Sequence, residues 1–264
     1  MSSAAPAVPG TAVVIEDEAD VRALIAQILV GAGFTVVEAP TGMDGIAAVE
    51  EHRPELITLD VNMPGIDGFE TARRIRALSK AYIVFITALN DEADVVLGFS
   101  AGADDVVIKP FRVRELRARL EALLRRQRPM DDDGDAAPAS PASPAADDSI
   151  RHGDLVVEIS RRTATLDGEP VVLTRTEFDL LVILLEAAGE VRSRADLVLA
   201  VRDEGYLGSG GVTDADEHAI GSHITNLRRK LGETGAEPRF IETVRGIGYR
   251  ATPTGNGQAY DTSR

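Results

Sequence analysis

Cysteine and tryptophan are absent from the 264 residues, and aromatic residues make up only 4% of them. Without cysteine there is no disulfide framework, no thiolate metal site and no cysteine nucleophile. No apolar run approaches the roughly 18 residues that a membrane helix needs. The first residues lack the basic flank and apolar stretch of a signal peptide. We therefore expect a soluble, cytoplasmic chain with no membrane partner.

Basic residues are also scarce, since 28 of them face 43 acidic residues and give a formal charge of −15. Such an excess argues against nucleic acid, because a DNA-binding domain usually shows a basic surface. The charge is unevenly spread, however. Residues 131–149 (DDDGDAAPASPASPAADDS) carry −6, residues 1–130 carry −5 and residues 150–264 carry −4.

The acidic segment 131–149 contains no Val, Ile, Leu, Met or aromatic residue. It cannot bury enough apolar surface to offset the entropy of ordering, which predicts a disordered linker between two domains of ordinary size. We predict a flexible N-terminus at 1–10, a first domain at 11–128, a disordered acidic Ala/Pro linker at 129–150, a second domain at 151–252 and a flexible tail at 253–264.

In the first domain, short β-branched runs alternate with segments of helical periodicity. The runs lie at 12–15, 35–37, 56–59, 82–86 and 106–108, and the helical segments at about 21–29, 43–52, 68–78, 92–101 and 113–127. Apolar strands that alternate with helices predict an α/β fold, a doubly wound parallel sheet of five βα units.

Polar residues follow four of these strands. Glu16 and Asp17 follow the first, Asp60 the third, Thr87 ends the fourth, and Lys109 follows the fifth. The carboxyl ends of parallel strands share one edge, where ligands bind. Clustered carboxylates suit Mg²⁺, and a carboxylate beside that metal can attack a phosphoryl group to form an aspartyl phosphate. An ammonium and a hydroxyl would then stabilise the phosphoryl oxygens.

The paired acid and the strings LDVNMPGIDGFE, ITA and KPF resemble the receiver domain of two-component response regulators over about residues 11–127. The resemblance implies that a sensor histidine kinase phosphorylates the chain, and that a cis peptide bond precedes Pro110. The site residues it implies are Asp60 as phosphoacceptor, Thr87 and Lys109 on the phosphoryl oxygens, and Asp17, Asp60, the Asn62 carbonyl and, through water, Glu16 around Mg²⁺.

The second domain reads as α+β. Strands are predicted at 155–157, 163–166 and 171–173, with an Asp167-Gly168 hairpin turn between the last two. Thr174 and Glu177 form a capping box that opens an apolar helix, and a second helix covers 193–201. A glycine-rich stretch at 205–211 lacks the Gly-Lys-Ser/Thr of a P-loop. A helix at 216–231 and a hairpin of 241–244 with 249–251 complete the domain.

The helix at 216–231 places Ile220, Ile224, Leu227 and Leu231 on one face. Residues 218–250 hold six basic and three acidic side chains, so this part is locally positive. A helix with a polar, basic face fits the major groove, and an arginine at a hairpin tip can enter the minor groove. The simpler alternative for the charge alone is a basic helix in solvent.

The strings ATLDGEPVVLTRTEFDLLVILL and HITNLRRKLGE with FIETVRGIGYR resemble the winged helix-turn-helix domain of OmpR/PhoB-type regulators over roughly residues 152–252. The resemblance implies a homodimer on double-stranded promoter DNA and contact with RNA polymerase. The implied DNA contacts are His223, Arg228 and Arg229 to phosphates, Thr225 and Asn226 to bases, and Thr243 and Arg245 from the wing.

Several positions depart from the receiver pattern. Val106 stands where the family usually has Tyr or Phe, and Val95 and Ala101 stand where it often has charges. We therefore expect intact phosphorylation that is coupled to dimerisation differently from typical relatives. The switch and dimer face implied by the resemblance comprises Asp105, Val106, Glu115, Arg119 and Arg126.

Two other functions remain open. The chain could bind DNA without phosphorylation, with the receiver acting mainly as a dimerisation module. It could also be a phosphatase, but that chemistry needs an acid two residues after the nucleophile, where Asn62 stands. We therefore expect Asp60 to be a stoichiometric acceptor with slow self-dephosphorylation rather than a turnover catalyst.

Overall fold

The structure is a computed structural model that describes residues 10–88, 92–113, 116–117, 149–202 and 212–253. The chain divides into two units, Met1–Leu123 and Leu124–Arg264. The predicted N-terminus, most of the linker, the glycine-rich stretch 205–211 and most of the tail lie outside the described residues. The first strand of the second unit begins at Ser149, inside the predicted linker.

The first unit contains a five-stranded parallel sheet. Its strands are β1 (Thr11–Ile15), β2 (Thr35–Ala39), β3 (Leu56–Leu59), β4 (Tyr82–Thr87) and β5 (Asp105–Ile108), in the order β2-β1-β3-β4-β5. Every predicted strand is confirmed. The strand order reverses beside β1, so β1 and β3 lie next to each other and their carboxyl ends share an edge.

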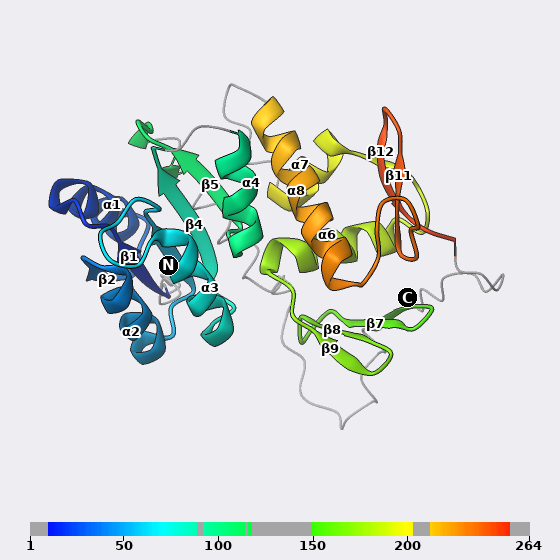
Figure 1. Cartoon of the computed structure of the whole chain (residues 1–264), viewed down its shortest axis with the longest axis horizontal. Coiled ribbons are helices and arrows are strands. Elements are labelled where there is room, and N and C mark those ends of the chain that lie inside the picture. The colour runs from blue at the N-terminus through cyan, green and yellow to red at the C-terminus, as the bar shows by residue number, and fades with distance from the viewer. Residues whose placement is uncertain (1–9, 89–91, 114–115, 118–148, 203–211, 254–264) are drawn as a thin grey trace, which may run out of the picture. The chain divides into compact units, whose positions relative to one another are not determined.

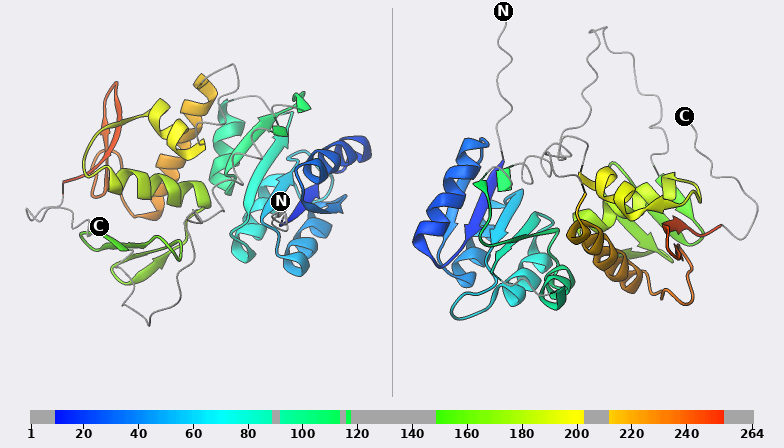
Figure 2. Two further views of the ribbon diagram at one scale, coloured as in Figure 1. Left: turned by 180° about the vertical axis from the view of Figure 1, so that it is seen from behind. Right: turned by 90° about the horizontal axis from the view of Figure 1, so that it is seen from above.

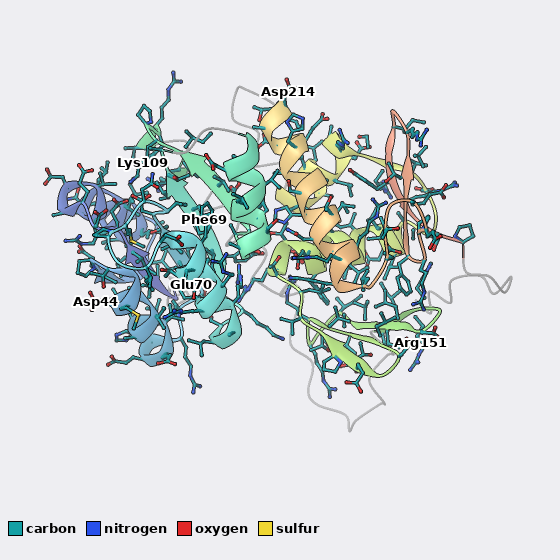
Figure 3. All side chains as sticks on the ribbon, viewed as in Figure 1. Asp44, Phe69, Glu70, Lys109, Arg151 and Asp214 are labelled. Atoms are coloured by element: carbon teal, nitrogen blue, oxygen red, sulfur yellow. The ribbon has the colours of Figure 1, made fainter. Side chains whose placement is uncertain are left out.

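Four helices in the described part of this unit lie around the sheet (Figure 1), and the predicted helix at 113–127 falls largely outside the described residues. The four are α1 (Ala19–Gly31), α2 (Gly42–His52), α3 (Gly68–Leu78) and α4 (Glu92–Ala101). Helices α2, α3 and α4 lie side by side, whereas α1 packs against β1 and β2. Helix α3 begins where the Asp67 carboxylate accepts the Glu70 N–H at 2.7 Å. Phe69 lies in the first turn of α3 (Figure 3). Its ring makes an edge-type contact with the Phe85 ring on β4, with 5.7 Å between the ring centroids.

Arg76 ties the end of α3 to the segments that flank β4 and β5. Its Nε donates to the Gly102 carbonyl at 2.7 Å, and its Nη atoms contact the Ala81 carbonyl and the Asp104 carboxylate. The Asp104 side chain is 0% exposed and also accepts the Ile83 N–H at 3.0 Å. A buried carboxylate requires such compensation, because desolvation strongly disfavours its charge.

We expect Arg76→Ala to lower the free energy of unfolding of this unit by about 3–5 kcal/mol, because it leaves Asp104 buried without its cation. Urea denaturation of the full chain measures the change. Arg73→Ala on the same helix is the control, since it removes only an exposed ion pair with Glu70 and should barely move the transition. Equal effects of the two substitutions would contradict the role given to Arg76.

The second unit contains two antiparallel sheets and three described helices (Figure 2). One sheet is β6 (Ser149–His152), β7 (Leu155–Glu158), β8 (Thr163–Leu166) and β9 (Glu169–Val171), in sequence order. The other is β10 (Arg192–Ser193), β11 (Ile241–Val244) and β12 (Gly248–Ala251), in the order β10-β12-β11. The helices are α6 (Arg175–Glu186), α7 (Arg194–Arg202) and α8 (Asp214–Lys230).

Turn and cap geometry explains where the strands and helices begin. Asp167 and Gly168 both have positive φ, 53° and 84°, and form the predicted two-residue turn. Leu166 therefore pairs with Glu169, and β9 begins immediately after the turn rather than at the predicted 171. Helix α8 begins two residues before its predicted start, because Thr213 caps it and Asp216 completes a capping box. Strands β6 and β10 were not predicted.

The core of this unit lies among α6, α7 and α8. The predicted capping box of Thr174 and Glu177 is present at the start of α6. Glu177 also accepts from Lys230 Nζ at 2.5 Å, which joins the end of α8 to the start of α6. None of the helices in the described parts of the chain combines the length and hydropathy that a bilayer crossing requires.

Candidate functional site

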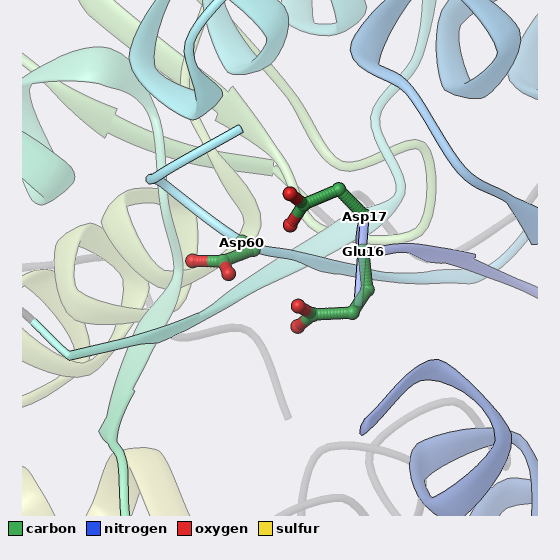
Figure 4. Close-up of side chains that lie close together, drawn as sticks. All are labelled: Glu16, Asp17 and Asp60. Atoms are coloured by element: carbon green, nitrogen blue, oxygen red, sulfur yellow. The ribbon is translucent and has the colours of Figure 1, made fainter. Parts of the chain in front are cut away.

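Three carboxylates gather at the carboxyl edge of the parallel sheet (Figure 4). Glu16 and Asp17 follow β1, and Asp60 follows the neighbouring β3. One ligand atom from each lies within 4.8 Å of the other two. Glu16 and Asp60 are buried, whereas Asp17 is exposed. The sheet order thus brings together the acids that the sequence separates by more than forty residues.

Lys109 lies between the two buried acids. Its Nζ donates to Asp60 Oδ2 at 2.7 Å and to Glu16 Oε2 at 2.8 Å. Its backbone N–H donates to the Thr87 carbonyl at 2.7 Å, and the Lys109–Pro110 peptide bond is cis, as expected. Residues from β1, β3, β4 and β5 therefore meet at one place.

Burial and charge together set the protonation of this cluster. Burial raises the pKa of Glu16 to about 7; the hydrogen bond from Lys109 opposes the rise and the charge of Asp60 adds to it. Burial disfavours the charged form of Lys109, but its hydrogen bonds to Asp60 and Glu16 outweigh this and raise its pKa above the usual value. The ammonium therefore stays protonated at neutral pH.

The backbone around Asp60 holds its carboxylate in place. The Asp60 N–H donates to the Ile15 carbonyl at 2.9 Å, and the Asn62 N–H donates to Asp60 Oδ1 at 3.1 Å. Gly68 at the start of α3 lies against the same segment, where an added Cβ would come within 2.2 Å of the Asp60 carbonyl oxygen. A glycine at position 68 is thus required for the shape of the site.

The donor set fits a hard divalent cation. Such ions take carboxylate and carbonyl oxygens, and the cluster offers three carboxylates within reach of one another. Glu16 Oε1 is buried and has no hydrogen-bond partner in the described part of the chain, so it has an unused lone pair. The expected carbonyl contribution of Asn62 stays a prediction. Thr87 is buried at the end of β4, where the expected phosphoryl contact would place it.

The expected switch and dimer face is only partly described. Val106 is half-buried on the edge strand β5, and Asp105 beside it is buried, with Oδ1 accepting the Val106 N–H at 2.9 Å. Ala101 is buried as well. Glu115, Arg119 and Arg126 lie outside the described residues, so the face stays a prediction.

Helix α8 exposes a different set of side chains from the one expected. His218, Thr225 and Arg229 are exposed and Ser222 is half-buried, at spacings of three or four residues that form one stripe. The hydroxyls of this stripe bond to their own helix: Thr225 Oγ1 donates to the Gly221 carbonyl at 2.9 Å. His218 and Ser222 were not among the expected contacts, although the spacing from Thr225 predicts them.

His223 and Asn226, which were both expected to contact DNA, have buried side chains. His223 lies three residues after Ile220 and four before Leu227, within the apolar stripe that faces the core. Asn226 lies at the edge of that stripe, where Oδ1 accepts weakly from Arg229 at 3.5 Å. Neither side chain is available for contact with DNA in this conformation.

Arg228 also differs from expectation, since its side chain is only 11% exposed. Its Nη2 donates to the Ile241 carbonyl and to Thr243 Oγ1, both at 2.8 Å. Thr243 is exposed on β11, and Arg245 and Ile247 are exposed at the hairpin tip. The expected wing residues are thus accessible, whereas Arg228 is held inside the domain.

Two family descriptions match this chain. "Response regulator receiver domain" matches residues 12–121, and "Transcriptional regulatory protein, C terminal" matches residues 168–251. Transcriptional regulatory protein AfsQ1 of Streptomyces coelicolor is 39% identical over 239 residues, 90% of this chain and 96% of AfsQ1. DNA-binding response regulator MtrA of Mycobacterium tuberculosis is 36% identical over 240 residues, 91% of this chain and 96% of MtrA.

Among solved structures, a mutant of RitR has a TM-score of 0.68 at 21% identity and covers 92% of this chain and 99% of its own. At that identity the likeness concerns the fold. The relatives match both units in the order in which they occur here, over nearly their whole length. This chain therefore belongs to the OmpR/PhoB family of two-component response regulators.

Proposed function

We propose that a sensor histidine kinase phosphorylates this chain on Asp60, and that the phosphorylated protein regulates transcription by binding promoter DNA through α8 and the β11–β12 hairpin. One observation supports the chemistry above all: Lys109 donates to both Asp60 and Glu16 at the shared carboxyl edge of β1 and β3. This arrangement combines a nucleophile, a fixed cation and an acidic ligand set.

In the transfer, an Asp60 carboxylate oxygen attacks the phosphorus of the kinase phosphohistidine. The new P–O bond forms as the P–N bond breaks, and the leaving imidazole takes a proton from solvent. Lys109, already 2.7 Å from Asp60 Oδ2, remains beside the developing charge on the phosphoryl oxygens. The Thr87 hydroxyl donates to one of these oxygens.

Mg²⁺ held by Asp17, Asp60, the Asn62 carbonyl and, through water, Glu16 would supply the positive charge that the phosphoryl oxygens require. Asn62 supplies no carboxylate two residues after Asp60, so no general acid or base stands there for repeated turnover. Asp60 therefore acts as a stoichiometric acceptor that loses its phosphate slowly, and the chain is not a phosphatase.

Incubation of the full chain with acetyl phosphate and Mg²⁺ should add one phosphate, detected by intact mass. Asp60→Asn should add none, since an amide is not a nucleophile toward phosphorus, and Lys109→Ala should react far more slowly. Omission of Mg²⁺ should suppress the reaction of the wild type. A wild type that gains no phosphate would favour a regulator that works without phosphorylation.

Gly68→Ala should slow this phosphorylation and destabilise the first unit by about 1–3 kcal/mol, because the new methyl group displaces the Asp60 backbone. Gly31→Ala is the matched control, since nothing lies within 4 Å of its added Cβ and alanine is the better helix former. The rate of phosphate uptake and the urea midpoint measure both effects. A Gly68→Ala protein with wild-type kinetics would show that the close approach does not hold Asp60.

The DNA-binding part of the proposal rests on the exposed stripe of α8. Ser222 and Thr225 lie at its centre with small polar side chains that suit the base edges, and Thr225 adds a methyl group that can contact thymine. Arg229 at the end of the stripe and Arg245 on the hairpin are exposed cations, suited to a phosphate and to the minor groove, respectively. Thr243 remains a candidate contact on β11.

Several partners belong to the same proposal. The chain would bind DNA as a homodimer, since two copies double a modest set of phosphate contacts. Contact with RNA polymerase is proposed from the family resemblance, and the segment expected to make it, the loop 203–215, falls largely outside the described residues. Phosphorylation by a kinase and binding to promoter DNA would both take place in the cytoplasm.

Salt dependence tests the number of phosphate contacts. Of the six basic side chains in 218–250, four bond to acids of the unit: Arg228 to Glu233, Lys230 to Glu177, Arg239 to Asp154 and Arg250 to Glu242. Arg229 and Arg245 remain, so the slope of log K against log salt should be about −2 for each bound chain. Anisotropy titrations on footprinted promoter DNA measure this slope.

Arg229→Ala should flatten that slope by about 1 and weaken binding to all sequences alike. Thr225→Ala should instead alter the preferred sequence and leave the slope unchanged. Arg73→Ala in the receiver serves as a control for net charge and should change neither quantity. A slope that is the same in Arg229→Ala and the wild type would exclude a phosphate contact by Arg229.

A further inference from the structure

Arg228 and Glu233 join the end of α8 to both strands of the wing, the β11–β12 hairpin. Arg228 Nη2 donates to the Ile241 carbonyl and to Thr243 Oγ1 on β11, both at 2.8 Å. The Arg228 guanidinium lies 5.7 Å from the centroid of the Tyr249 ring on β12, and its Nε is 3.8 Å from Glu233 Oε1. The Arg228 side chain thus contacts both strands of the wing and Glu233.

Glu233 holds the chain that leads into β11. Its carboxylate accepts the N–H groups of Arg239 and Phe240, both at 2.6 Å, and that of Ile241 at 3.2 Å. The Glu233 side chain is 0% exposed. A buried carboxylate with three backbone donors and one nearby cation is fully compensated only while all four partners stay in place.

The two elements that this pair joins carry different DNA-facing side chains. Thr225 and Arg229 are exposed on α8, and Arg245 is exposed at the wing tip. A hairpin attached to its domain by backbone alone would sample many angles to the helix, and binding would have to order it at an entropic cost. A wing fixed in advance avoids that cost.

We propose that Arg228 and Glu233 form a brace that sets the wing at a fixed angle to α8, so that Arg228 is a positioning residue for DNA recognition and not a phosphate contact. The proposal rests on the DNA binding proposed above. To reach a phosphate, Arg228 would have to give up two hydrogen bonds and leave Glu233 buried without its cation. Arg229, the next residue of α8, is exposed and can contact a phosphate without breaking such bonds.

The conservative substitution separates the two roles. Lysine keeps the positive charge and can bind a phosphate, but it lacks the planar fork that reaches a carbonyl, a hydroxyl and a carboxylate together. In the full chain, Arg228→Lys should weaken promoter binding about tenfold, whereas the control Arg73→Lys, at an exposed ion pair of the receiver, should bind as the wild type does. Wild-type affinity in Arg228→Lys would overturn the brace.

For a second substitution, simple electrostatics and the brace predict changes of DNA affinity in opposite directions. Glu233→Gln removes a negative charge near the DNA-facing surface, so electrostatics alone predicts equal or tighter binding. The brace predicts weaker binding, because an amide cannot hold Arg228 and three N–H donors as a carboxylate does. Tighter binding with an unchanged thermal transition would overturn it. Should Glu233→Gln fail to fold, Arg228→Lys decides alone.

Double variants of Arg228→Lys show whether the brace acts on DNA binding through the wing. If Arg228 positions the wing, Arg228→Lys with Arg245→Ala should bind little worse than either single variant, since both lose the same contact. Arg228→Lys with Arg229→Ala should show the product of the two losses. Losses that multiply in both pairs would assign Arg228 a contact of its own and overturn the proposal.

Hydrogen exchange on free protein tests the brace without DNA. The amides of 239–241, which donate to Glu233, should exchange faster in Arg228→Lys, while those of α6 keep their wild-type rates. Unchanged exchange at 239–241 would count against the brace whatever the binding results. If the wild type fails to bind DNA but the exchange shift is present, the proposed function fails and the structural coupling stands.

Discussion

Two buried carboxylates that share one ammonium group are the constraint on which the first unit depends. Glu16 and Asp60 follow adjacent parallel strands, so the sheet forces like charges together at one edge. Burial and mutual repulsion both disfavour this arrangement, and Lys109 offsets them by donating to both acids. The same unfavourable charge gives the site its chemistry. A cluster with an excess of carboxylates over cations binds a divalent ion readily, and Lys109 already stands where phosphoryl charge would develop.

Much of this site can be predicted from the sequence, because parallel strands fix where the residues that follow them must lie. Once the apolar runs are identified as strands, the residues that follow them must meet at one edge, and Glu16, Asp60 and Lys109 do so. The sequence does not reveal how the edge is kept in shape. The approach of Gly68 to the Asp60 carbonyl and the contacts of Arg76 with Gly102 and Asp104 depend on helix placement, which arises from packing across the whole sheet.

Helix α8 shows a different limit. His223 and Asn226 were assigned to DNA from the family resemblance, yet His223 repeats at helical spacing with Ile220 and Leu227, so the sequence itself contained the signal for burial. Arg228 is another matter. Its partners lie five to fifteen residues further along the chain, in a connection and a hairpin whose positions are set by tertiary packing. Helical periodicity could have indicated that His223 and Asn226 are buried. Only the structure shows that Arg228 is bonded within its own domain.

The ion pairs of the second unit reduce the positive charge that is available to DNA. Counting residues 218–250 gives an excess of three positive charges, but four of the six cations bond to acids of the same unit. The field that DNA meets is therefore weaker than composition implies, in a chain whose net charge is −15. Nonspecific binding, which depends almost wholly on phosphate contacts, should be correspondingly poor. In the proposed function, affinity would then come from base contacts by a correctly oriented helix and wing. Because only Arg229 and Arg245 of the six cations in 218–250 lie outside these ion pairs, the fixed geometry of the two elements matters more than their charge.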